Sequence, residues 1–275
     1  MKSDCEKLKK SSVSVKKWIA KQPAVKEESI TDWLLYDVSR SIPKITYRAF
    51  SRHEEARDTG ADWEWWFLFP TFSAKMRVQA KKIDLTKDNY PNIAHTNQYG
   101  LQIEKLLSDS KDKNFMPFYA FYTSVQESVM CKFRINNEGV FLAGGKQVYV
   151  DFIKNGKRTV QPADILLKCV PLSCFLCCPL GSEGTEGFIR FLASYYFLEM
   201  GFENEKEALD AYPGAMAGIY REVPSYISSF IEHSREKLPD WWEQEFRNYL
   251  EGTNALVVYD ARDDEQPNLP QKLGQ

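Results

Sequence analysis

The sequence predicts an α/β protein in which a mixed β-sheet is flanked by helices. Two observations support this fold class. In the first half of the chain the residue periodicity changes in the order helix, three strands, helix, strand. In the second half helical periodicity dominates, with room for a few more strands. We therefore expect one sheet-containing core with a mainly helical C-terminal elaboration.

The elements of the first half follow from local patterns. Residues 28–40 carry apolar side chains on one helical face, and the helix ends before Pro43. Three strands are expected next, with a polar turn after the first of them, at residues 45–50, 62–69 and 76–83. A second helix and a short apolar strand suited to burial complete this half, at residues 95–108 and 115–122.

The second half is expected to extend the same domain. Residues 140–153 contain strand-like stretches around a Gly-Gly turn, and residues 255–259 form a possible last strand. Helical periodicity is seen at residues 185–200, 205–212 and 225–250. The chain then divides into a basic N-terminal arm, a core, an elaboration and a disordered tail, at residues 1–26, 27–125, 126–260 and 261–275.

Composition excludes several classes of protein. The chain is 43% hydrophobic and 27% charged, which is typical of a globular protein, and its formal net charge of −2 excludes a histone-like polycation. A locally basic cleft for nucleic acid stays possible. The N-terminal segment lacks the apolar stretch of a signal peptide, and no apolar run reaches the ~18–20 residues of a membrane helix. We therefore expect a cytoplasmic protein with no membrane contact and with its six cysteines reduced.

The histidine content argues against a histidine-rich zinc site. The three histidines, His53, His95 and His233, lie far apart in the sequence. A metal ion, if bound, is then expected to be a hard cation held by carboxylate and carbonyl oxygens, such as Mg²⁺ or Mn²⁺.

Four polar residues alternate along two consecutive predicted strands. Asp62 and Glu64 are two residues apart, so their side chains point to one face of the sheet. Gln79 and Lys81 share a face of the next strand for the same reason. Two interpretations stay open: a surface hairpin with a hydrated polar face, or a cation site with Asp62 and Gln79 as ligands and Lys81 beside them.

The order of these residues and elements resembles the PD-(D/E)xK restriction-endonuclease-like nucleases. Gly60-Ala61-Asp62 is similar to the family's Asp motif, and Gln79-Ala80-Lys81 matches the Gln-x-Lys form of the Mrr-like branch. A GADWEWW-like strand, a VQAK-like strand and a Gln-containing helix also resemble an uncharacterised bacterial family of this clan. The resemblance covers residues 27–123 and departs from the family pattern in having neither a Pro before Asp62 nor an acid at position 79.

The resemblance implies a Mg²⁺- or Mn²⁺-dependent endonuclease that hydrolyses phosphodiester bonds of DNA. Asp62, Gln79 and the backbone carbonyl of Ala80 would be the metal ligands. Lys81 would orient the attacking water and help to deprotonate it. Glu28 resembles the accessory acid that many members carry on their first helix, and Glu64 would either bind a second metal ion or hold Lys81.

The same resemblance suggests partners, and it leaves alternatives open. Double-stranded DNA is the expected substrate, a homodimer is expected by analogy, and prokaryotic genome defence with a partner protein rests on family association alone. The alternatives are a catalytically inactive nucleic-acid-binding or regulatory module and a protein-interaction scaffold on the helical second half.

A cluster of cysteines at residues 169–178 is the remaining motif. Cys174 and Cys177 have CxxC spacing, but no second pair follows and apolar residues are interspersed. Packing of small hydrophobic thiols in the core is the preferred interpretation.

Overall fold

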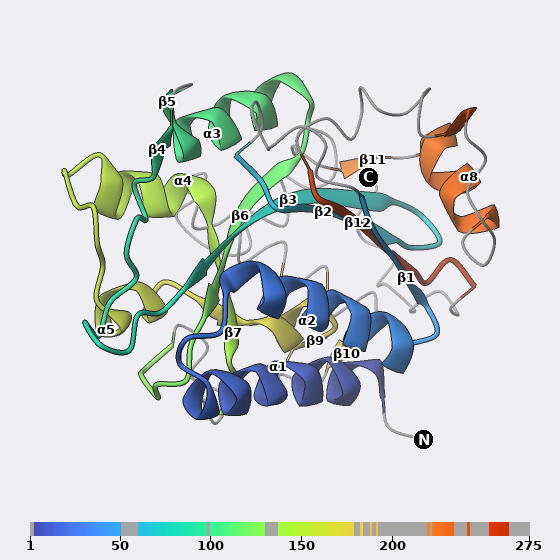
Figure 1. Ribbon diagram of the computed structural model, residues 1–275. Coiled ribbons are helices and arrows are strands. Elements are labelled where there is room, and N and C mark those ends of the chain that lie inside the picture. Colours follow the sequence, from blue (N-terminus) through green and yellow to red (C-terminus); the bar gives the residue numbers. More distant parts are fainter. Residues whose placement is uncertain are drawn as a thin grey trace.

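A mixed β-sheet runs through the centre of the computed structural model, with helices on both of its faces (Figure 1). The strand order is β1-β12-β2-β3-β6-β7-β8, and β11 pairs with β3. The β12–β2 and β3–β6 pairs are parallel, whereas the other pairs of this sheet are antiparallel. The structure describes residues 3–50, 60–97, 100–129, 137–178, 182–183, 188, 191, 219–220, 222–233, 241–242 and 253–263.

The strands of this sheet differ in length, and the longest of them is β3. Their bounds are β1 Ile45–Ala49, β2 Trp63–Leu68, β3 Ser73–Lys82, β6 Met116–Tyr122, β7 Val140–Gly144, β8 Val170–Pro171, β11 Ile219–Tyr220 and β12 Ala255–Asp260. Two small hairpins lie outside the sheet: β4 Thr96–Asn97 with β5 Gly100–Leu101, and β9 Cys177–Cys178 with β10 Ser182–Glu183.

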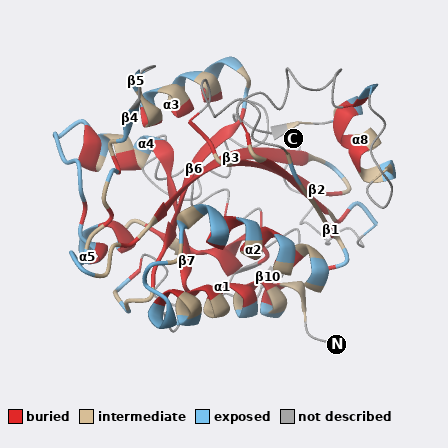
Figure 2. Ribbon diagram, viewed as in Figure 1, coloured by how far each residue is buried: buried red, intermediate tan, exposed pale blue. Residues whose placement is uncertain are grey.

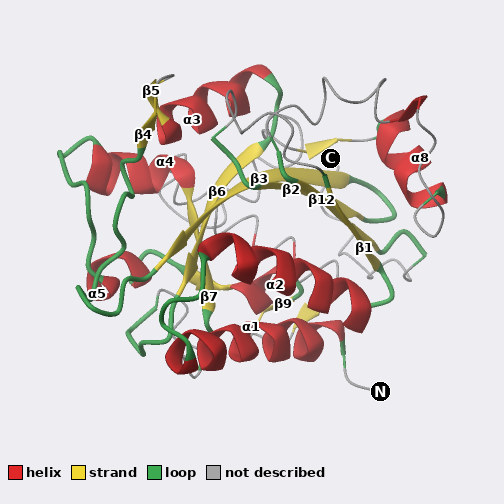
Figure 3. Cartoon of the chain, in the orientation of Figure 1, coloured by secondary structure: helices red, strands yellow, loops and turns green. Residues whose placement is uncertain are grey.

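The helices are interspersed with the strands along the chain (Figure 3). Their bounds are α1 Asp4–Lys21, α2 Glu27–Ser41, α3 Gln102–Asp112, α4 Gly145–Val148, α5 Pro162–Leu166 and α8 Ser225–Glu232. A π-helical turn, η1 Tyr149–Ile153, and a 3₁₀ turn, η2 Leu172–Phe175, complete the described elements. Among them, no helix combines the length and the apolar character that crossing a membrane requires.

Buried residues lie in the sheet and in the helices beside it (Figure 2), and they form two separate apolar clusters. On one face Trp63 and Trp65 join a large apolar core with buried residues of α1 and α2. On the other face Trp66 packs with Leu256 of β12 and Tyr226 of α8 in a smaller core. The two faces follow from the period-2 alternation of side chains along β2.

The observed elements confirm the fold class, an α/β mixed sheet flanked by helices, and the arrangement is consistent with a restriction-endonuclease-like fold. The expected helix at 28–40 corresponds to α2, and the expected strands at 62–69 and 115–122 correspond to β2 and β6. Every residue of β2 and β6 is buried, which explains why these strands are apolar almost throughout.

The expected basic N-terminal arm is wrong as a description of residues 4–21. They form α1, whose Leu8, Val15 and Ile19 are buried in the large core, and α1 contacts α2 and β7. The lysines of this segment obscure an apolar stripe at helical spacing. The arm is therefore part of the folded domain.

The expected core boundary at residue 125 is also wrong. β12, from the C-terminal end of the chain, lies between β1 and β2 and pairs with both. β7 and β8 extend the same sheet beyond β6. β11 from the same region pairs with β3, so the sheet is complete only when the region expected to be an elaboration contributes four strands.

Several other boundaries differ from expectation. The helix expected at 95–108 begins at Gln102, because residues 96–101 contain the β4–β5 pair and Gly100 has a φ of +111°. The stretch expected as strands at 140–153 becomes helical after β7. The helices expected at 185–200 and 205–212 lie almost wholly outside the described residues, as do the polar turn at 54–60 and most of the tail at 261–275.

The cysteines do not all match the expectation of reduced thiols. Cys169 and Cys174 are buried thiols that form no disulfide, in agreement with core packing. Cys5 of α1 is disulfide-bonded, so the expectation is wrong for that residue. Its partner lies outside the side chains that the structure describes.

Candidate functional site

The candidate site lies where β2 begins and β3 approaches its end. β2 and β3 are antiparallel neighbours with Trp63 opposite Val78 and Glu64 opposite Arg77. Asp62 immediately precedes β2, and its backbone N–H donates to the carbonyl of Val78 at 2.8 Å. The Asp62 side chain lies beside that of Gln79, to which it is hydrogen-bonded, and Lys81 is on the same side of β3 as Gln79.

Asp62 and Gln79 are joined directly. The Gln79 amide Nε2 donates to Asp62 Oδ2 at 2.7 Å and to the backbone carbonyl of Ala80 at 3.1 Å. The backbone N–H of Ala80 donates to the same Asp62 oxygen at 2.6 Å. Two oxygen acceptors, one of them anionic, thus converge on the NH₂ group of Gln79.

A second amide links Gln79 to Lys81. Gln102, the first residue of α3, donates through Nε2 to Gln79 Oε1 at 2.6 Å and accepts from Lys81 Nζ at 3.3 Å. Gln79 is 2% exposed and Lys81 8% exposed, so this chain of groups is largely shielded from solvent. The structure brings Asp62, Gln79, Ala80 and Lys81 together, as the sequence pattern predicted.

Gly60 allows α3 to approach this strand. Its φ is +67°, and a Cβ atom at this position would lie 2.3 Å from the backbone oxygen of Gln102. A residue with a side chain would be strained in φ and would collide with α3. The glycine that precedes Asp62 therefore helps to place Gln102 beside Gln79.

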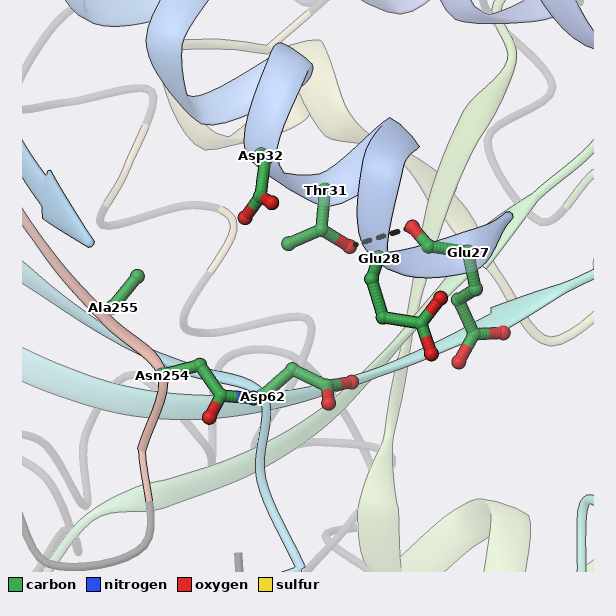
Figure 4. Close-up of a pocket in the computed structure, with 7 residues that line it drawn as sticks. All are labelled: Glu27, Glu28, Thr31, Asp32, Asp62, Asn254 and Ala255. Atoms are coloured by element: carbon green, nitrogen blue, oxygen red, sulfur yellow. Dashed lines mark hydrogen bonds between the residues drawn. The ribbon is translucent and has the colours of Figure 1, made fainter. Parts of the chain in front are cut away.

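Asp62 also lines a pocket (Figure 4). It has about 310 Å³ of empty space, part of it open to solvent, and four carboxylates are among its lining residues. Glu27 and Glu28 extend from the first turn of α2 toward the strand that carries Asp62, and Asp32 lies one turn further along the helix (Figure 4). The remaining lining residues are Thr31, Asn254 and Ala255. Glu28, which the resemblance implies as the accessory acid, lines this pocket and is exposed.

Glu27 is less exposed than Glu28 and is hydrogen-bonded to β3. Its Oε2 accepts a hydrogen bond from the backbone N–H of Lys82 at 2.5 Å. Burial raises the pKa of Glu27 to about 7; the carboxylates of Asp62 and Glu28 add to the rise, while Lys81 and the Lys82 N–H oppose it. Glu27 would therefore be partly protonated near neutral pH, and a cation in the pocket would favour its ionised form.

The structure corrects the expectation for Glu64. Its side chain is fully buried, and its carboxylate accepts from Arg77 Nε at 3.0 Å and from Trp66 Nε1 at 2.7 Å. Lys75 Nζ lies 3.7 Å away, and Tyr226 donates through its hydroxyl at 3.1 Å. These four groups surround the Glu64 carboxylate. Glu64 therefore does not hold Lys81, and it does not line the pocket.

The surrounding lysines form a weaker basic patch than the sequence suggests. The Lys82 ammonium donates to the carbonyls of Pro23 and Ile83, and Lys87 pairs with Asp84 at 3.6 Å. Arg52 and Arg57, which flank the site in sequence, lie outside the described residues.

Sequence reasoning missed Gln102 and Glu27. Gln102 belongs to the Gln-containing helix noted in the resemblance, but nothing in its spacing showed that it reaches Lys81. Glu27 immediately precedes Glu28, and only the phase of α2 decides that both carboxylates face the same pocket. A helical projection started at residue 27 could have included it.

The oxygen atoms at this site suit a hard cation, and few of them carry a charge. Within the described ranges, no group of three or more His, Cys, Asp or Glu side chains is arranged to hold a metal ion. The converging ligands would instead be the Asp62 carboxylate, the Ala80 carbonyl and, after reorientation of its amide, Gln79 Oε1. Oxygen ligands of this kind suit Mg²⁺ or Mn²⁺, which retain several waters and need only one or two carboxylates.

Comparison with known protein families covers almost the whole chain. Residues 4–266 match the model of DUF6615, a family of unknown function. The chain belongs to DUF6615. The match starts at the first residue of α1 and extends past β12. The family model therefore includes both α1, which was expected to be an arm, and β12, which was expected to lie outside the core. No curated protein matches this DUF6615 chain.

Proposed function

We propose that this protein is a Mg²⁺- or Mn²⁺-dependent endonuclease that hydrolyses phosphodiester bonds of DNA. The observation that carries the proposal is the convergence of Asp62, Gln79, the Ala80 carbonyl and Lys81 on adjacent strands. The buried amide and ammonium are hydrogen-bonded to Asp62 and Gln102, and Asp62 also lines a pocket bordered by three further carboxylates.

The chemistry follows from these groups. A divalent cation, when bound, would neutralise charge on the phosphate oxygens and lower the pKa of a water molecule. Asp62, Gln79 and the Ala80 carbonyl would hold that cation. The Lys81 ammonium would orient the attacking water and stabilise negative charge that develops on the phosphoryl oxygens. The pocket beside Asp62 would admit the cation and its waters, with Glu28 as the accessory acid and Glu27 beside it.

The setting of the reaction belongs to the same proposal. Double-stranded DNA is the proposed substrate, in the cytoplasm, with a homodimer as the form that cuts both strands. Participation in prokaryotic genome defence with a partner protein is proposed from the family resemblance alone.

The test is a cleavage assay with the full chain. Plasmid, linear double-stranded DNA and RNA are incubated with protein in Mg²⁺, Mn²⁺ or EDTA. We expect nicking or linearisation of plasmid that requires the cation and is lost in Asp62→Ala. Cleavage that persists in EDTA, or equally in Asp62→Ala, would contradict the proposal.

A binding module without catalysis is the second candidate. It is favoured by the neutral amide of Gln79, because the proposed ligand set then carries a single carboxylate, Asp62. In the same assay this candidate predicts a salt-sensitive gel shift without cleavage.

A further inference from the structure

Gln102 connects the proposed cation ligands to Lys81 through a directional series of hydrogen bonds. Lys81 donates to Gln102, Gln102 donates to Gln79, and Gln79 donates to Asp62 and the Ala80 carbonyl. Each amide uses its oxygen on the Lys81 side and its nitrogen on the Asp62 side. The two amides are therefore oriented in the same sense.

This orientation is incompatible with a cation at Asp62. The Gln79 NH₂ hydrogens point toward the oxygens that would bind the ion, and a cation repels them. Rotation of the amide about its last side-chain bond would present Oε1 to the ion instead. The oxygen and nitrogen of an amide have nearly the same size, so the reversal changes hydrogen bonding without changing packing.

Reversal of Gln79 has a consequence at Gln102. The Gln79 NH₂ group would then face the Gln102 NH₂ group, and two donors cannot bond to each other. Gln102 regains a bond by reversing as well, which turns its own NH₂ toward the Lys81 ammonium. Lys81 has three donors and no acceptor, so its bond to Gln102 is lost. Among the described residues Gln102 is the hydrogen-bond partner of the Lys81 ammonium.

We propose that Gln102 is a positioning residue that transmits cation binding to Lys81, because both amides reverse together and release the ammonium toward the reacting phosphate. The inference rests on the proposed function and deepens it. Without the cation, Lys81 is held by Gln102; with the cation, Lys81 is available to the water and the phosphate. Gly60 contributes by allowing the first turn of α3 to lie against the strand.

The direct test uses nuclear magnetic resonance of the full chain with ¹⁵N-labelled glutamine and lysine side chains. Signals are assigned with Gln79→Glu, Gln102→Met and Lys81→Met. On titration with Mg²⁺ we expect the side-chain signals of Gln79, Gln102 and Lys81 to change with one midpoint. In Gln102→Met the Gln79 signals should still respond, while the Lys81 signal should already lie near its cation-saturated position before Mg²⁺ is added.

A second measurement separates coupling from a merely structural role. Both oxygens of the carboxylate introduced by Gln102→Glu accept hydrogen bonds. One can accept from the NH₂ group of the reversed Gln79 amide, and the other can keep the bond from the Lys81 ammonium. We expect Mn²⁺ to bind at least about fivefold more tightly to this variant, while kcat falls by a similar factor. Ser108→Glu adds the same charge on the exposed side of α3 and should change neither quantity by more than about twofold.

The outcomes distinguish this inference from the proposed function. If Mg²⁺ changes the Gln79 signals but leaves Gln102 and Lys81 unchanged, the coupling is wrong and the cation site stands. If Gln102→Glu both weakens Mn²⁺ binding and lowers kcat, Gln102 has only a structural role. If no cation binds to the wild-type protein, the proposed function fails, and the inference fails with it.

Discussion

Two polar clusters lie on the same side of β2 and β3, only two residues apart, and they are neutralised in different ways. We call the first the ion network; its members are Glu64, Lys75, Arg77 and Asp109. Glu64 pairs with Arg77 and Lys75, and Arg77 also pairs with Asp109 of α3. The second cluster is the candidate site, where the Asp62 carboxylate and the Lys81 ammonium are each bonded to neutral amides.

The difference between the clusters indicates what each one does. In the ion network each charge meets an opposite charge away from solvent, so the cluster joins α3 and the sheet. In the candidate site the carboxylates of Asp62, Glu27, Glu28 and Asp32 border an open pocket. Negative charge gathered at a pocket favours a cation there. Neighbouring positions on the same two strands thus serve stability in one case and, under the proposed function, cation binding in the other.

The largest expected effect concerns the ion network. Arg77→Met removes the fully buried guanidinium and leaves Glu64 and Asp109 without it. We expect the free energy of unfolding to fall by about 3–5 kcal/mol, because a buried pair is broken by removing one partner. Urea unfolding measures this, and Arg40→Met, in an exposed pair with Asp37, should cost less than about 1 kcal/mol. A loss below about 1 kcal/mol for Arg77→Met would place the network among ordinary surface pairs.

Substitution of Lys81 should lower activity rather than stability. Lys81→Met keeps the aliphatic stem and removes the ammonium, so we expect cleavage to slow by about 10²–10⁴-fold with Mn²⁺ affinity retained. Lys82→Met is the matched control on the adjacent residue, whose ammonium bonds to backbone carbonyls. Near wild-type cleavage by a folded Lys81→Met protein would remove Lys81 from the mechanism.

Gln79→Glu tests the convergence of acceptors. The substitution replaces the NH₂ group that bonds Asp62 and Ala80 by an oxygen, so acceptors face each other without a donor. We expect a loss of about 1–3 kcal/mol without cation. Saturating Mn²⁺ should recover most of it, because the new carboxylate is a better ligand than the amide. Thermal unfolding with and without Mn²⁺ measures both values, and an equal loss in both conditions would argue against a cation between these oxygens.

The pH dependence of stability should distinguish Glu27 from Glu64. Burial acts to raise the pKa of Glu64, but Lys75 and Arg77 lower it below the unfolded value of 4.5. The ionised Glu64 therefore contributes its full stabilisation above pH 4.5, and this stabilisation is lost as the pH falls through the pKa of the folded state. The pKa of Glu27 is raised to about 7, so the folded state binds its proton more tightly and stability declines as the pH rises from 4.5 to 7.

Glu27→Gln should therefore stabilise the cation-free protein above pH 7, by about 1–2 kcal/mol after allowance for partial exposure, and have little effect near pH 4.5. Urea unfolding at pH 5 and pH 8 measures the change. Glu28→Gln, at the exposed neighbouring position, is the control. A Glu27→Gln protein with the same stability difference from wild type at both pH values would show that Glu27 titrates normally.

The sequence predicted the proximity of Asp62, Gln79 and Lys81 better than it predicted the boundaries of the fold. Period-2 alternation was enough to put Asp62, Gln79 and Lys81 on one face. The same register also puts Glu64 opposite Arg77, so its ion pair could have been found by continuing the count along β2 and β3. The position of β12 between β1 and β2 depends on pairing between distant segments, which local periodicity does not encode. Gln102 reaches Lys81 only because Gly60 allows a close approach, which is likewise a tertiary feature.

The most direct test of the central claim is calorimetric titration of Mn²⁺ into wild type, Asp62→Asn and Asp32→Asn. Both substitutions remove one carboxylate from the same pocket, but only Asp62 is bonded to Gln79 and Ala80. We predict one site in the wild-type protein, binding at least about tenfold weaker in Asp62→Asn, and a change of less than about threefold in Asp32→Asn. Equal Mn²⁺ affinity in wild type and Asp62→Asn would contradict a cation site at Asp62.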